Sequence, residues 1–593
     1  MKIVHCFAEN KIEKETAQDI GFLLTNQLGG YLSLSDYPYS RYQGWFCAEN
    51  EKVFKIIENL EIIDALPIEE LTNNFWNIER KRNQVTESFF LPASSNSLVY
   101  ELSSVSEIEL ILDIHESYDN RGWKREYEIS EEDGIIIVRY NQADECQIYL
   151  AVKPDIFEYF KPDQWFARYY HLDEQRNSPP SKRYVYKALK LKGRKFVFSS
   201  SQNREKAVEE AKKVFTDAEE LKKIKQRKIQ KLAFPEIIMD PRIRMSFICA
   251  RHSLDSLTVF QDPKKPGIYA GLPWFFQFWS EDEAISLKAV SGFNPVLAKK
   301  ILFRLMESVK EDGKIPNISF GMQTKEDKES VYGIGWVFDR ISDLAAKEKL
   351  NKNETQKIKK YLEKSVSGLL QNYTQDDLAI NSSFDTWMDT QERSGARIEN
   401  QALRLKMYQL AYQLTKESRY LKLERHLRKK VQEKFWNGEF LADGSDDFTV
   451  RPNIFIAAYL YPKLLKKEEW IKCFENVLSK LWLEWGGVAT LDQTDPLFIA
   501  QYSGENGKSY HNGDSWFYLN NLIALVLYRF GMEKFGLYIN KILEASEEEI
   551  LWQGVIGHHG ELSSAVKFNS EGSWAQAWSD AFYIEIIDEL LKK

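Results

Sequence analysis

The sequence lacks the features of a disulfide-stabilised, zinc-binding or membrane-spanning protein. Its five cysteines in 593 residues form no C-x-x-C pair and leave one over, so neither a disulfide framework nor a zinc site is indicated. The amino terminus, MKIVHCFAENKIEKE, reaches charged residues too early for a secretory signal. The longest apolar run, at 522–528, is far shorter than a bilayer span. We therefore expect a protein of a reducing cytoplasm with no membrane partner.

An excess of positive charge and the common catalytic motifs are also missing. The formal net charge is −8, and a phosphate-backbone partner needs a clustered basic surface, so nucleic acid is not expected as a ligand. The chain has no GxSxG elbow, HExxH helix, P-loop or GxGxxG turn, and the pair His558 and His559 lacks partner ligands for a metal. Carboxylates and aromatic side chains are the chemistry that remains.

Aromatic residues, by contrast, are abundant. They make up 13% of the chain and include 16 Trp and 29 Tyr. Two interpretations are open at this point: large aromatic cores, or a groove lined by flat apolar faces of the kind on which sugars stack. The length of 593 residues exceeds what one hydrophobic core organises, so we expect two to four domains.

The first third of the chain carries strand signals. From about 95 to 200, short runs rich in β-branched and aromatic residues are bounded by turn chemistry, and EEDG at 131–134 separates two of them as a hairpin turn would. This pattern predicts antiparallel sheet. Residues 204–233 then place apolar side chains three or four apart amid Lys and Glu, which predicts an amphipathic helix. We interpret it as a connector between domains that ends near Pro235.

Beyond Pro235, helical periodicity dominates and strand signals nearly vanish. Polar, aromatic-rich stretches interrupt the predicted helices, and marker residues taken from them are 57, 53, 64, 58 and 50 residues apart: Trp279, Trp336, Asp389, Asn453, His511 and Glu561. Each interval fits two helices with their loops. Six helical hairpins with their special loops at one end predict a closed (α/α)6 toroid. The alternative, an open α-solenoid, would show similarity from repeat to repeat, and we find none.

Two of these stretches combine carboxylates with large aromatic residues. In 267–287, the five aromatic residues between positions 274 and 279, among them Trp274 and Trp279, precede Glu281, Asp282 and Glu283 at a helix start. The helix dipole offers another explanation for Glu281 and Glu283, because it favours acidic residues in a first turn. The stretch SSFDTWMDTQERSGARIENQ, residues 382–401, sets Trp387 beside Asp389.

Two later stretches repeat the combination. Residues 509–521 contain His511 and Trp516, and residues 554–582 hold Glu561 in a loop rich in Gly and Ser, followed by Trp574 and Trp578. Carboxylates among flat apolar faces are what glycoside hydrolysis needs. One carboxylic acid, kept protonated by burial against aromatics, protonates the leaving oxygen, while a second, ionised, activates water on the other face of the sugar.

At these residues the sequence resembles the glycogen debranching enzyme family, in particular its amylo-α-1,6-glucosidase part as found in single-activity archaeal and bacterial proteins. The similar motifs follow one another over most of the chain. They are FLLTNQLGGYLSLSDYPYSRYQGWF (22–46), AGLPWFFQFWSEDEAISL, TWMDT with GARIENQAL, RPNIFIA, GGVATLDQTDP, YHNG, and GEL with AQAWS.

The resemblance implies an N-terminal β-sandwich domain (1–203), a helical linker (204–235), an (α/α)6 catalytic domain (236–593) and an inverting mechanism. It implies Asp389 as general acid and Glu561 as general base, with Trp387 in the sugar-binding wall. Asp282 would hold hydroxyls in the first subsite. The remaining residues expected to contact substrate are Trp274, Trp279, Trp336, Glu399, His511, Trp516 and Trp574. No cofactor is required, and the expected partner is an α-glucan or oligosaccharide.

The sequence departs from the family pattern at three places. The family's WGRD is WSED here, so Ser280 and Glu281 replace Gly and Arg and reverse a charge; the acid usual ahead of Trp336 is absent, with Tyr332 near its place; and YHQG has become YHNG. We expect an inverting, exo-acting α-glucosidase that removes α-1,6-linked glucose from branch stubs of glycogen-like glucans. The alternatives are a glucoamylase-like or trehalase-like hydrolase on the same fold, and a carbohydrate-binding protein without turnover.

Overall fold

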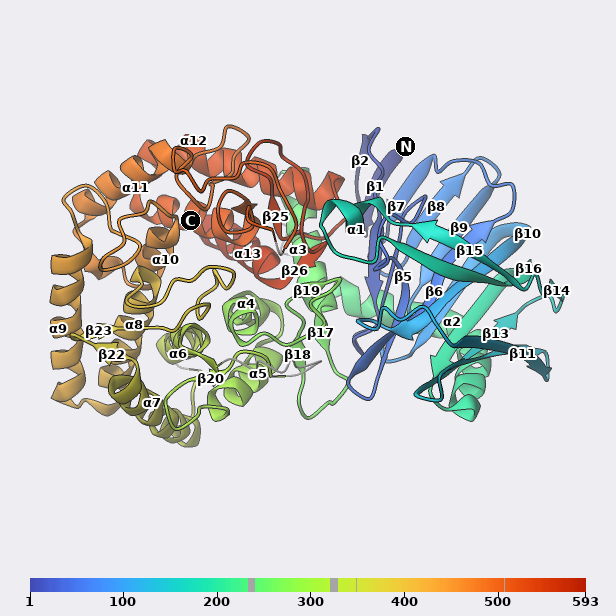
Figure 1. The fold of residues 1–593 in the computed structure, drawn as a ribbon, viewed down its shortest axis with the longest axis horizontal. Helices are drawn as coiled ribbons and strands as arrows, with labels where there is room; N and C mark the ends of the chain where they lie inside the picture. Colours follow the sequence, from blue (N-terminus) through green and yellow to red (C-terminus); the bar gives the residue numbers. More distant parts are fainter. Residues whose placement is uncertain (233–239, 320–328, 348, 506, 593) are drawn as a thin grey trace. The chain divides into compact units, whose positions relative to one another are not determined.

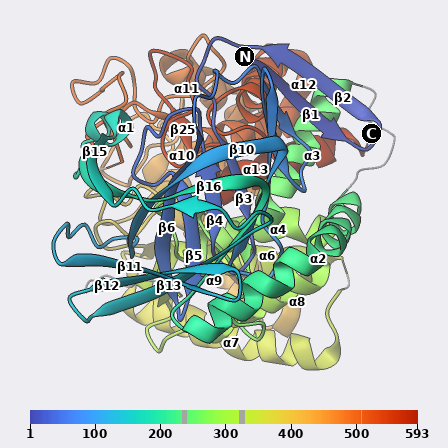
Figure 2. The same ribbon diagram turned by 90° about the vertical axis from the view of Figure 1, so that its right-hand side faces the viewer.

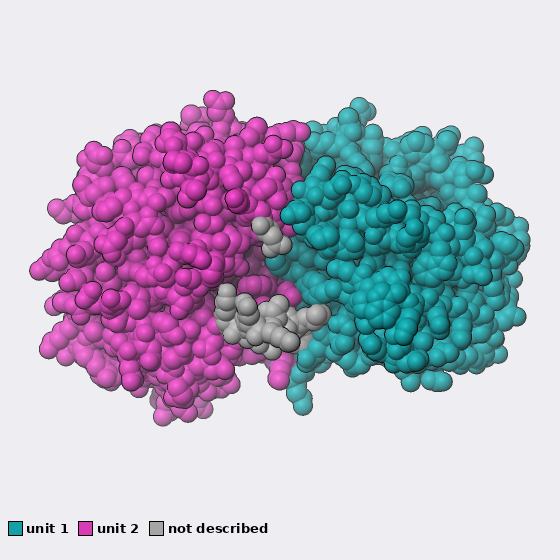
Figure 3. All heavy atoms as spheres, viewed as in Figure 1, with its two compact units in different colours: residues 1–264, 271–276, 548–558 teal, residues 265–270, 277–547, 559–593 magenta. Residues whose placement is uncertain are grey.

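The computed structural model describes residues 1–232, 240–319, 329–347, 349–505 and 507–592. The chain divides into two compact units (Figure 3). The first comprises residues 1–264, 271–276 and 548–558, and the second comprises residues 265–270, 277–547 and 559–593. The end of the connector near Pro235, and with it the boundary expected at 235–236, lies outside the described residues.

The first unit is built on one large sheet, whose strands are β1 (Lys2–Phe7), β2 (Asn10–Glu15), β3 (Phe22–Thr25), β4 (Tyr31–Leu34), β5 (Gly44–Glu49), β6 (Lys52–Ile62), β7 (Glu70–Asn73), β8 (Ile78–Arg82), β9 (Val85–Phe90), β10 (Ser97–Glu116), β11 (Arg125–Glu132), β12 (Ile135–Gln142), β13 (Cys146–Pro154), β14 (Tyr159–Phe160), β15 (Gln164–Tyr169) and β16 (Lys182–Ser201). Its main path runs β11-β12-β13-β16-β10-β9-β8-β7-β1-β2. The prediction of an antiparallel sheet over 95–200 is confirmed. The whole sheet is mixed, because β1 pairs in parallel with β7.

Two long strands connect the parts of this sheet. β10 pairs with β16 on one side and with β6 and β9 on the other, and register shifts between Glu101 and Ser106 and between Leu110 and Ile111 interrupt its ladder with β16. Such shifts let a long strand bend. The hairpin predicted at EEDG is confirmed, since β11 and β12 are joined by Asp133 and Gly134, both with positive φ, as the tight two-residue turn requires.

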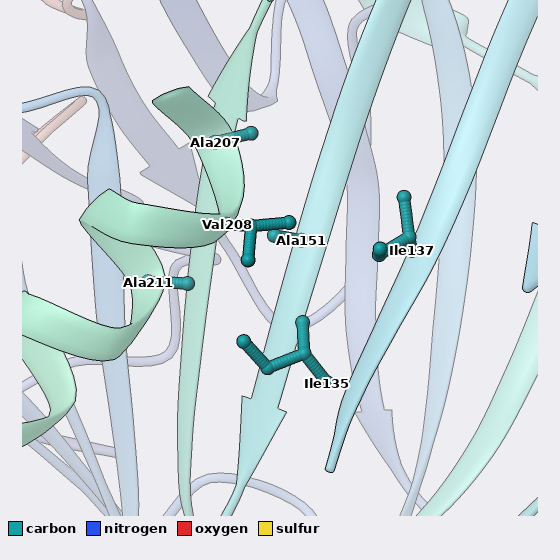
Figure 4. Packing of buried hydrophobic residues seen from close by; sticks show 6 residues of the cluster. All are labelled: Ile135, Ile137, Ala151, Ala207, Val208 and Ala211. Atoms are coloured by element: carbon teal, nitrogen blue, oxygen red, sulfur yellow. The ribbon is translucent and has the colours of Figure 1, made fainter. Parts of the chain in front are cut away.

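The helix predicted over 204–233 is confirmed as α2 (Arg204–Gln230), which packs on β13, β16 and β10 (Figure 2). Asn203 caps it by accepting a hydrogen bond from the backbone N–H of Lys206. Its small apolar side chains meet the sheet in one cluster (Figure 4), formed by Ile135, Ile137, Ala151, Ala207, Val208 and Ala211. The first unit also contains α1 (His171–Gln175), α3 (Pro241–Ser256) and the strand β17 (Thr258–Val259).

The second unit is mainly helical (Figure 1), with α4 (Ser280–Phe293), α5 (Pro295–Glu307), α6 (Val331–Ala346), α7 (Lys352–Asn372), α8 (Ile398–Thr415), α9 (Ser418–Phe435), α10 (Asn453–Leu460), the 3-10 helix η1 (Pro462–Leu464), α11 (Lys467–Leu481), α12 (Phe517–Trp552) and α13 (Ala577–Leu590). Gly531 interrupts the helical dihedrals of α12, so this element comprises two helical segments. The last residues of α12, from Glu548 onward, belong to the first unit.

The helices of the second unit pack in a regular succession. α13 packs on α4, α4 on α6, α6 on α8, and α8 on α10, while α5, α7 and α9 pack against members of this series. The connections between helices carry two-residue strands, namely β18 (Gly267–Ile268), β20 (Ile315–Pro316), β21 (Glu329–Ser330), β22 (Thr374–Gln375), β23 (Leu378–Ala379), β24 (Ser515–Trp516), β25 (Leu562–Ser563) and β26 (Ala575–Gln576), with β19 (Gly271–Leu272) in the first unit. Among the described residues, no helix is both long and apolar enough to cross a membrane.

Candidate active site

Acidic side chains from three distant segments of the second unit come together. Asp282 lies in the first turn of α4, Asp389 in the segment between β23 and α8, and Glu561 just before β25. Burial raises the pKa of Asp282 well above its usual range, and the charges of Glu561 and Asp389 raise it further. Like-charge interactions of this kind act only over short distances in a protein. The three carboxylates that the sequence singled out therefore form one cluster.

Asp282 is held by a chain of hydrogen bonds. Gln576 donates from Nε2 to the Asp282 Oδ1 atom at 3.2 Å, and the Ser573 hydroxyl donates to the Gln576 Oε1 atom at 2.7 Å. The helix dipole at the start of α4 favours a negative charge. Burial and the neighbouring carboxylates nevertheless raise the pKa of Asp282, and only a backbone hydrogen bond lowers it.

Glu561 lies beneath the loop that leads to α13, and its side chain is only 1% exposed. The Tyr510 hydroxyl donates to its Oε1 atom, and the backbone N–H of Ser573 donates to its Oε2 atom at 2.8 Å. Gly572 covers the same carboxylate: its φ is +71°, and a Cβ there would lie 2.4 Å from Oε2. The loop therefore needs glycine at this position for both space and backbone conformation.

The loop that carries Asp389 is anchored by Trp387. The Trp387 indole donates from Nε1 to the Asn453 Oδ1 atom at 2.8 Å, and its ring meets Trp516 edge-on with centroids 5.5 Å apart. Asp389 itself is half-buried. Its charge contributes to the raised pKa of the Tyr510 hydroxyl, after burial and the larger effect of Glu561. Trp387 thus fixes the segment from which Asp389 projects.

His511 takes part in the same aromatic cluster as a neutral group. Its ring stacks on that of Trp516 at 5.1 Å with an interplanar angle of 3°, and its Nδ1 atom lies 2.7 Å from the Thr390 hydroxyl. Burial, with help from the charges of Arg451 and Arg393, lowers its pKa well below the usual value. Its Nε2 atom is buried and has no hydrogen-bond partner among the described residues. A sugar hydroxyl would satisfy that atom.

Glu399 lies at the start of α8 and is paired with an arginine. Arg393 donates to the Glu399 Oε1 atom at 2.8 Å and also binds Asp443 at 2.8 Å. Burial still raises the pKa of Glu399, because Arg393 only partly offsets it. The second carboxylate oxygen, Oε2, is buried and no described residue hydrogen-bonds to it.

The four other predicted tryptophans lie in different surroundings. Trp336 was expected in a loop but lies inside α6, fully buried, 5.9 Å from the ring of Tyr459. Trp279 is the N-cap residue of α4, and Trp574 is buried ahead of β26. Trp274 belongs to the first unit, where the Arg176 guanidinium lies 3.3 Å from its ring centroid.

Several polar groups around the cluster were not predicted from the sequence. Asp385 is buried four residues before Asp389; burial raises its pKa to about 7, and its Oδ2 atom has no partner among the described residues. The hydroxyls of Tyr332 and Tyr518 are also buried without a described partner. Tyr510, which donates to Glu561, was not predicted either, although its adjacency to His511 in YHNG could have indicated it. Over the described part of the chain, no group of three or more His, Cys, Asp or Glu is arranged to hold a metal.

Comparison with known proteins places the helical unit among glycosidases. The family model described as amylo-alpha-1,6-glucosidase matches residues 245–585. The chain is also similar in structure to a bacterial glucoamylase crystallised with acarbose, with a TM-score of 0.63 at 12% identity over 98% of this chain and 96% of the other. A glycosidase variant crystallised with glucose is similar at a TM-score of 0.45 and 14% identity, over 60% of this chain and 99% of the other. No curated protein sequence matches the chain significantly.

Proposed function

The chain belongs to the amylo-alpha-1,6-glucosidase family and is a glycoside hydrolase, and from this membership we propose that it removes α-1,6-linked glucose from branch stubs of glycogen-like glucans with inversion of configuration. The observation that carries the proposal is the cluster of Asp282, Asp389 and Glu561, whose charges act on one another. Asp389 is the general acid, Glu561 the general base, and Asp282 a ligand of the first-subsite hydroxyls.

The surroundings of Glu561 suit a base. The Tyr510 hydroxyl and the Ser573 N–H both donate to its carboxylate, and such charge-assisted hydrogen bonds stabilise the ionised form. In the reaction Glu561 takes a proton from water as the water oxygen bonds to C1 of the sugar. An inverting pair of carboxyl groups leaves room for that water, with a separation of roughly 6.5–9.5 Å.

Asp389 acts on the opposite side of the bond that breaks. Its proton passes to the glycosidic oxygen as the bond from C1 to that oxygen breaks, so the leaving glucan departs as a neutral alcohol. Negative charges on Asp282 and Asp389 disfavour each other, which supports a protonated Asp389 in the resting enzyme. The product is β-glucose, because water enters from the face opposite the departing group.

We also propose that the second unit is the closed (α/α)6 toroid and that residues 1–203 form the separate β-sandwich domain predicted from the sequence. The packing of α13, the last helix, on α4 supports closure, because an open solenoid leaves its terminal helices apart. In this arrangement α4, α6, α8, α10, the first segment of α12 and α13 form the inner ring. The loops that carry Asp282, Asp389 and Glu561 then lie at one end of it.

A glucoamylase-like activity on α-1,4 linkages is the second candidate. The similarity to the bacterial glucoamylase extends over nearly the whole of both chains, whereas the family model covers only residues 245–585. The shape of the loops beyond the first subsite decides between the linkages, and a shared fold does not fix it.

One experiment tests both candidates. The protein is incubated separately with isomaltose, panose, maltotriose, trehalose and phosphorylase limit dextrin, and the released glucose is followed by NMR to identify its first anomer. We expect β-glucose, released faster from panose and limit dextrin than from maltotriose. Faster release from maltotriose would favour the glucoamylase-like activity. Release of α-glucose would contradict inversion, and release from none of the five would contradict hydrolysis of α-glucosides.

A further inference from the structure

Glu281 is a buried acid in the cluster that the proposed mechanism does not use. It lies in the first turn of α4 and is only 6% exposed. Among the described residues, none forms a hydrogen bond or an ion pair with its side chain. Its neighbour Glu283 is different, because Arg304 binds both Glu283 carboxylate oxygens, at 2.6 and 2.7 Å. Two acids two residues apart in one helix turn therefore have opposite electrostatic surroundings.

The charges that act on Glu281 are all negative. Burial raises its pKa well above the usual value, and the charges of Asp282, Asp389 and Asp385 raise it further. No cation of the described residues offsets these effects appreciably. An ionised carboxylate is disfavoured in such a place, because it is buried without a counter-charge. Burial and the neighbouring acids therefore favour the protonated form of Glu281, which can donate a hydrogen bond.

Unsatisfied hydroxyls lie close to this carboxyl group. The charge of Glu281 contributes to the raised pKa values of Tyr332, in α6, and Tyr518, in α12, although burial is the main cause in both. Both hydroxyls are buried, and neither has a hydrogen-bond partner among the described residues. Buried polar groups without partners are rare in folded proteins unless water or a ligand satisfies them. The hydroxyls of a pyranose ring both donate and accept hydrogen bonds, so a bound sugar could satisfy the Glu281 carboxyl group and the two tyrosine hydroxyls.

The charges that act on Glu281 are those of Asp282 on α4 itself and of Asp385 and Asp389 on the segment before α8. Glu281 in turn acts on Tyr332 on α6 and Tyr518 on α12. The neighbouring elements also carry Asp580 on α13, Lys314, which acts on Asp385, and the ion pairs Glu283–Arg304, Glu399–Arg393, Lys288–Glu585 and Asp339–Arg340. Arg304 is bound to Glu283, and Arg393 to Glu399 and Asp443. The excess charge around Glu281 is therefore negative.

We propose that Glu281 is a specificity-determining residue that binds the first-subsite sugar as a neutral carboxylic acid, donating a hydrogen bond to a sugar hydroxyl. The inference rests on the proposed function and deepens it by naming the ligand class, an uncharged hexopyranosyl unit. A sugar that carries a carboxylate or phosphate would add to the uncompensated negative charge of the cluster and is rejected. The proton stays on Glu281 throughout, so this residue takes no part in bond breaking.

The test is glucose binding as a function of pH, followed by tryptophan fluorescence and without turnover. Sugar binds the protonated form, so we expect the affinity of the wild type to be full below the pKa of Glu281 and to fall as pH rises through it. The fall approaches about tenfold per pH unit. Glu281→Gln keeps a neutral donor at every pH. Its glucose affinity should therefore stay within about threefold of that of the wild type at low pH, and most of the decrease with rising pH should be absent. Glu311→Gln, which removes an exposed acid, should behave as the wild type.

A second measurement needs no variant. When glucose binds at a pH above the pKa of Glu281, the wild type should take up a proton, which calorimetry in two buffers of different ionisation enthalpy detects. Absence of uptake, or an affinity that rises with pH, overturns the proposal. So does an unchanged pH dependence in Glu281→Gln, which would assign the proton to another acid of the cluster. Because binding is measured without turnover, a failure of the proposed hydrolysis appears separately, as no glucose released from any saccharide.

Discussion

Two sets of buried acids, one in each unit, have opposite electrostatic surroundings. In the first unit, Asp113 is fully buried, but Arg125 donates to its Oδ1 atom at 2.7 Å and Arg183 to its Oδ2 atom at 2.8 Å. Burial alone would raise the pKa of Asp113, yet Arg183, His115 and Arg125 hold it well below its usual range. In the second unit, Glu281 and Asp282 are equally buried, and their neighbours raise their pKa values.

This difference in counter-charges distinguishes acids that stabilise the fold from acids that take part in binding or catalysis. A buried acid with matched counter-charges belongs to the scaffold, because removing one partner mainly destabilises the fold. A buried acid that lacks counter-charges is unfavourable for stability and is kept where a protonated carboxyl group or a ligand contact is needed. Glu87 in the first unit follows the first pattern, with Arg80 and Arg82 lowering its pKa against the effect of burial. The cluster around Asp282 follows the second.

We expect the largest effect from neutralising the proposed catalytic pair, Asp389 and Glu561. We expect Asp389→Asn and Glu561→Gln each to lower kcat by about 10²–10⁴-fold, since each removes a proton transfer from the transition state. The unfolding midpoint and glucose affinity should change little. Glucose release, thermal unfolding and fluorescence titration measure the three quantities. Rates equal to those of the wild type would remove both residues from the mechanism.

The matched test in the first unit is Asp113→Asn. It leaves Arg125 and Arg183 buried without their counter-charge, so we expect a loss of about 3–5 kcal/mol in the free energy of unfolding. The kcat of the folded enzyme should be unchanged. Asp133→Asn is the control: Asp133 is exposed in the β11–β12 turn at φ +49°, which Asn tolerates, and its effect should stay within about 0.5 kcal/mol. Urea unfolding measures both. A stable Asp113→Asn variant would contradict the scaffold role.

A third test moves an acid without changing any charge. In Gly572→Ala the new Cβ would lie 2.4 Å from the Glu561 Oε2 atom, so the carboxylate must shift. We expect kcat to fall by about 10²-fold, the cost of roughly 1 Å of misplacement. Gly438→Ala is matched to it, because Gly438 also has a positive φ, +93°, but open space around its Cβ position. That control carries the backbone strain alone, so a similar loss of kcat in both variants would assign the loss to strain and not to displacement of the Glu561 carboxylate.

The sequence predicts repeated patterns well and individual contacts poorly. The helix α2 and the hairpin at 131–134 follow from local periodicity and turn residues, which need no tertiary information. The stretches that carry Asp282, Asp389 and Glu561 stand out because they combine carboxylates with large aromatic residues, and the resemblance to the glycogen debranching enzyme family implies the role of each acid. Their partners were not found, because the pairing of Arg393 with Glu399, or of Tyr510 with Glu561, depends on how distant loops pack.

Two tryptophans show the limits of this approach most directly. Trp336 was chosen as a loop marker because of its spacing, but the residues around it form a regular helix, α6, and its ring is buried. Trp274 was grouped with Asp282 because they are eight residues apart, yet residues 271–276 belong to the first unit. That both rings contact substrate stays a prediction, and the structure shows the element and the unit to which each ring belongs.

The smallest effect on activity is expected for a substitution of Asp514, a buried acid of the second unit to which we assign no catalytic role. Asp514 accepts a hydrogen bond from the Ser509 hydroxyl at 2.8 Å, and its other carboxylate oxygen has no partner in the described part of the chain. Burial raises its pKa to about 8. The unfolded chain loses this proton near pH 4, so the native state is destabilised progressively as pH rises from about 4 to about 8.

Asp514→Asn removes this pH dependence, because the amide has no proton to lose. We expect the variant to gain on the order of 4 kcal/mol relative to the wild type between about pH 5 and about pH 9, measured by urea unfolding at each pH. Asp113→Asn should show no such gain, since Asp113 is already ionised in the native state at these pH values. If the two stability curves of Asp514→Asn and the wild type run parallel, burial without a counter-charge does not govern this acid, and the contrast between the units weakens accordingly.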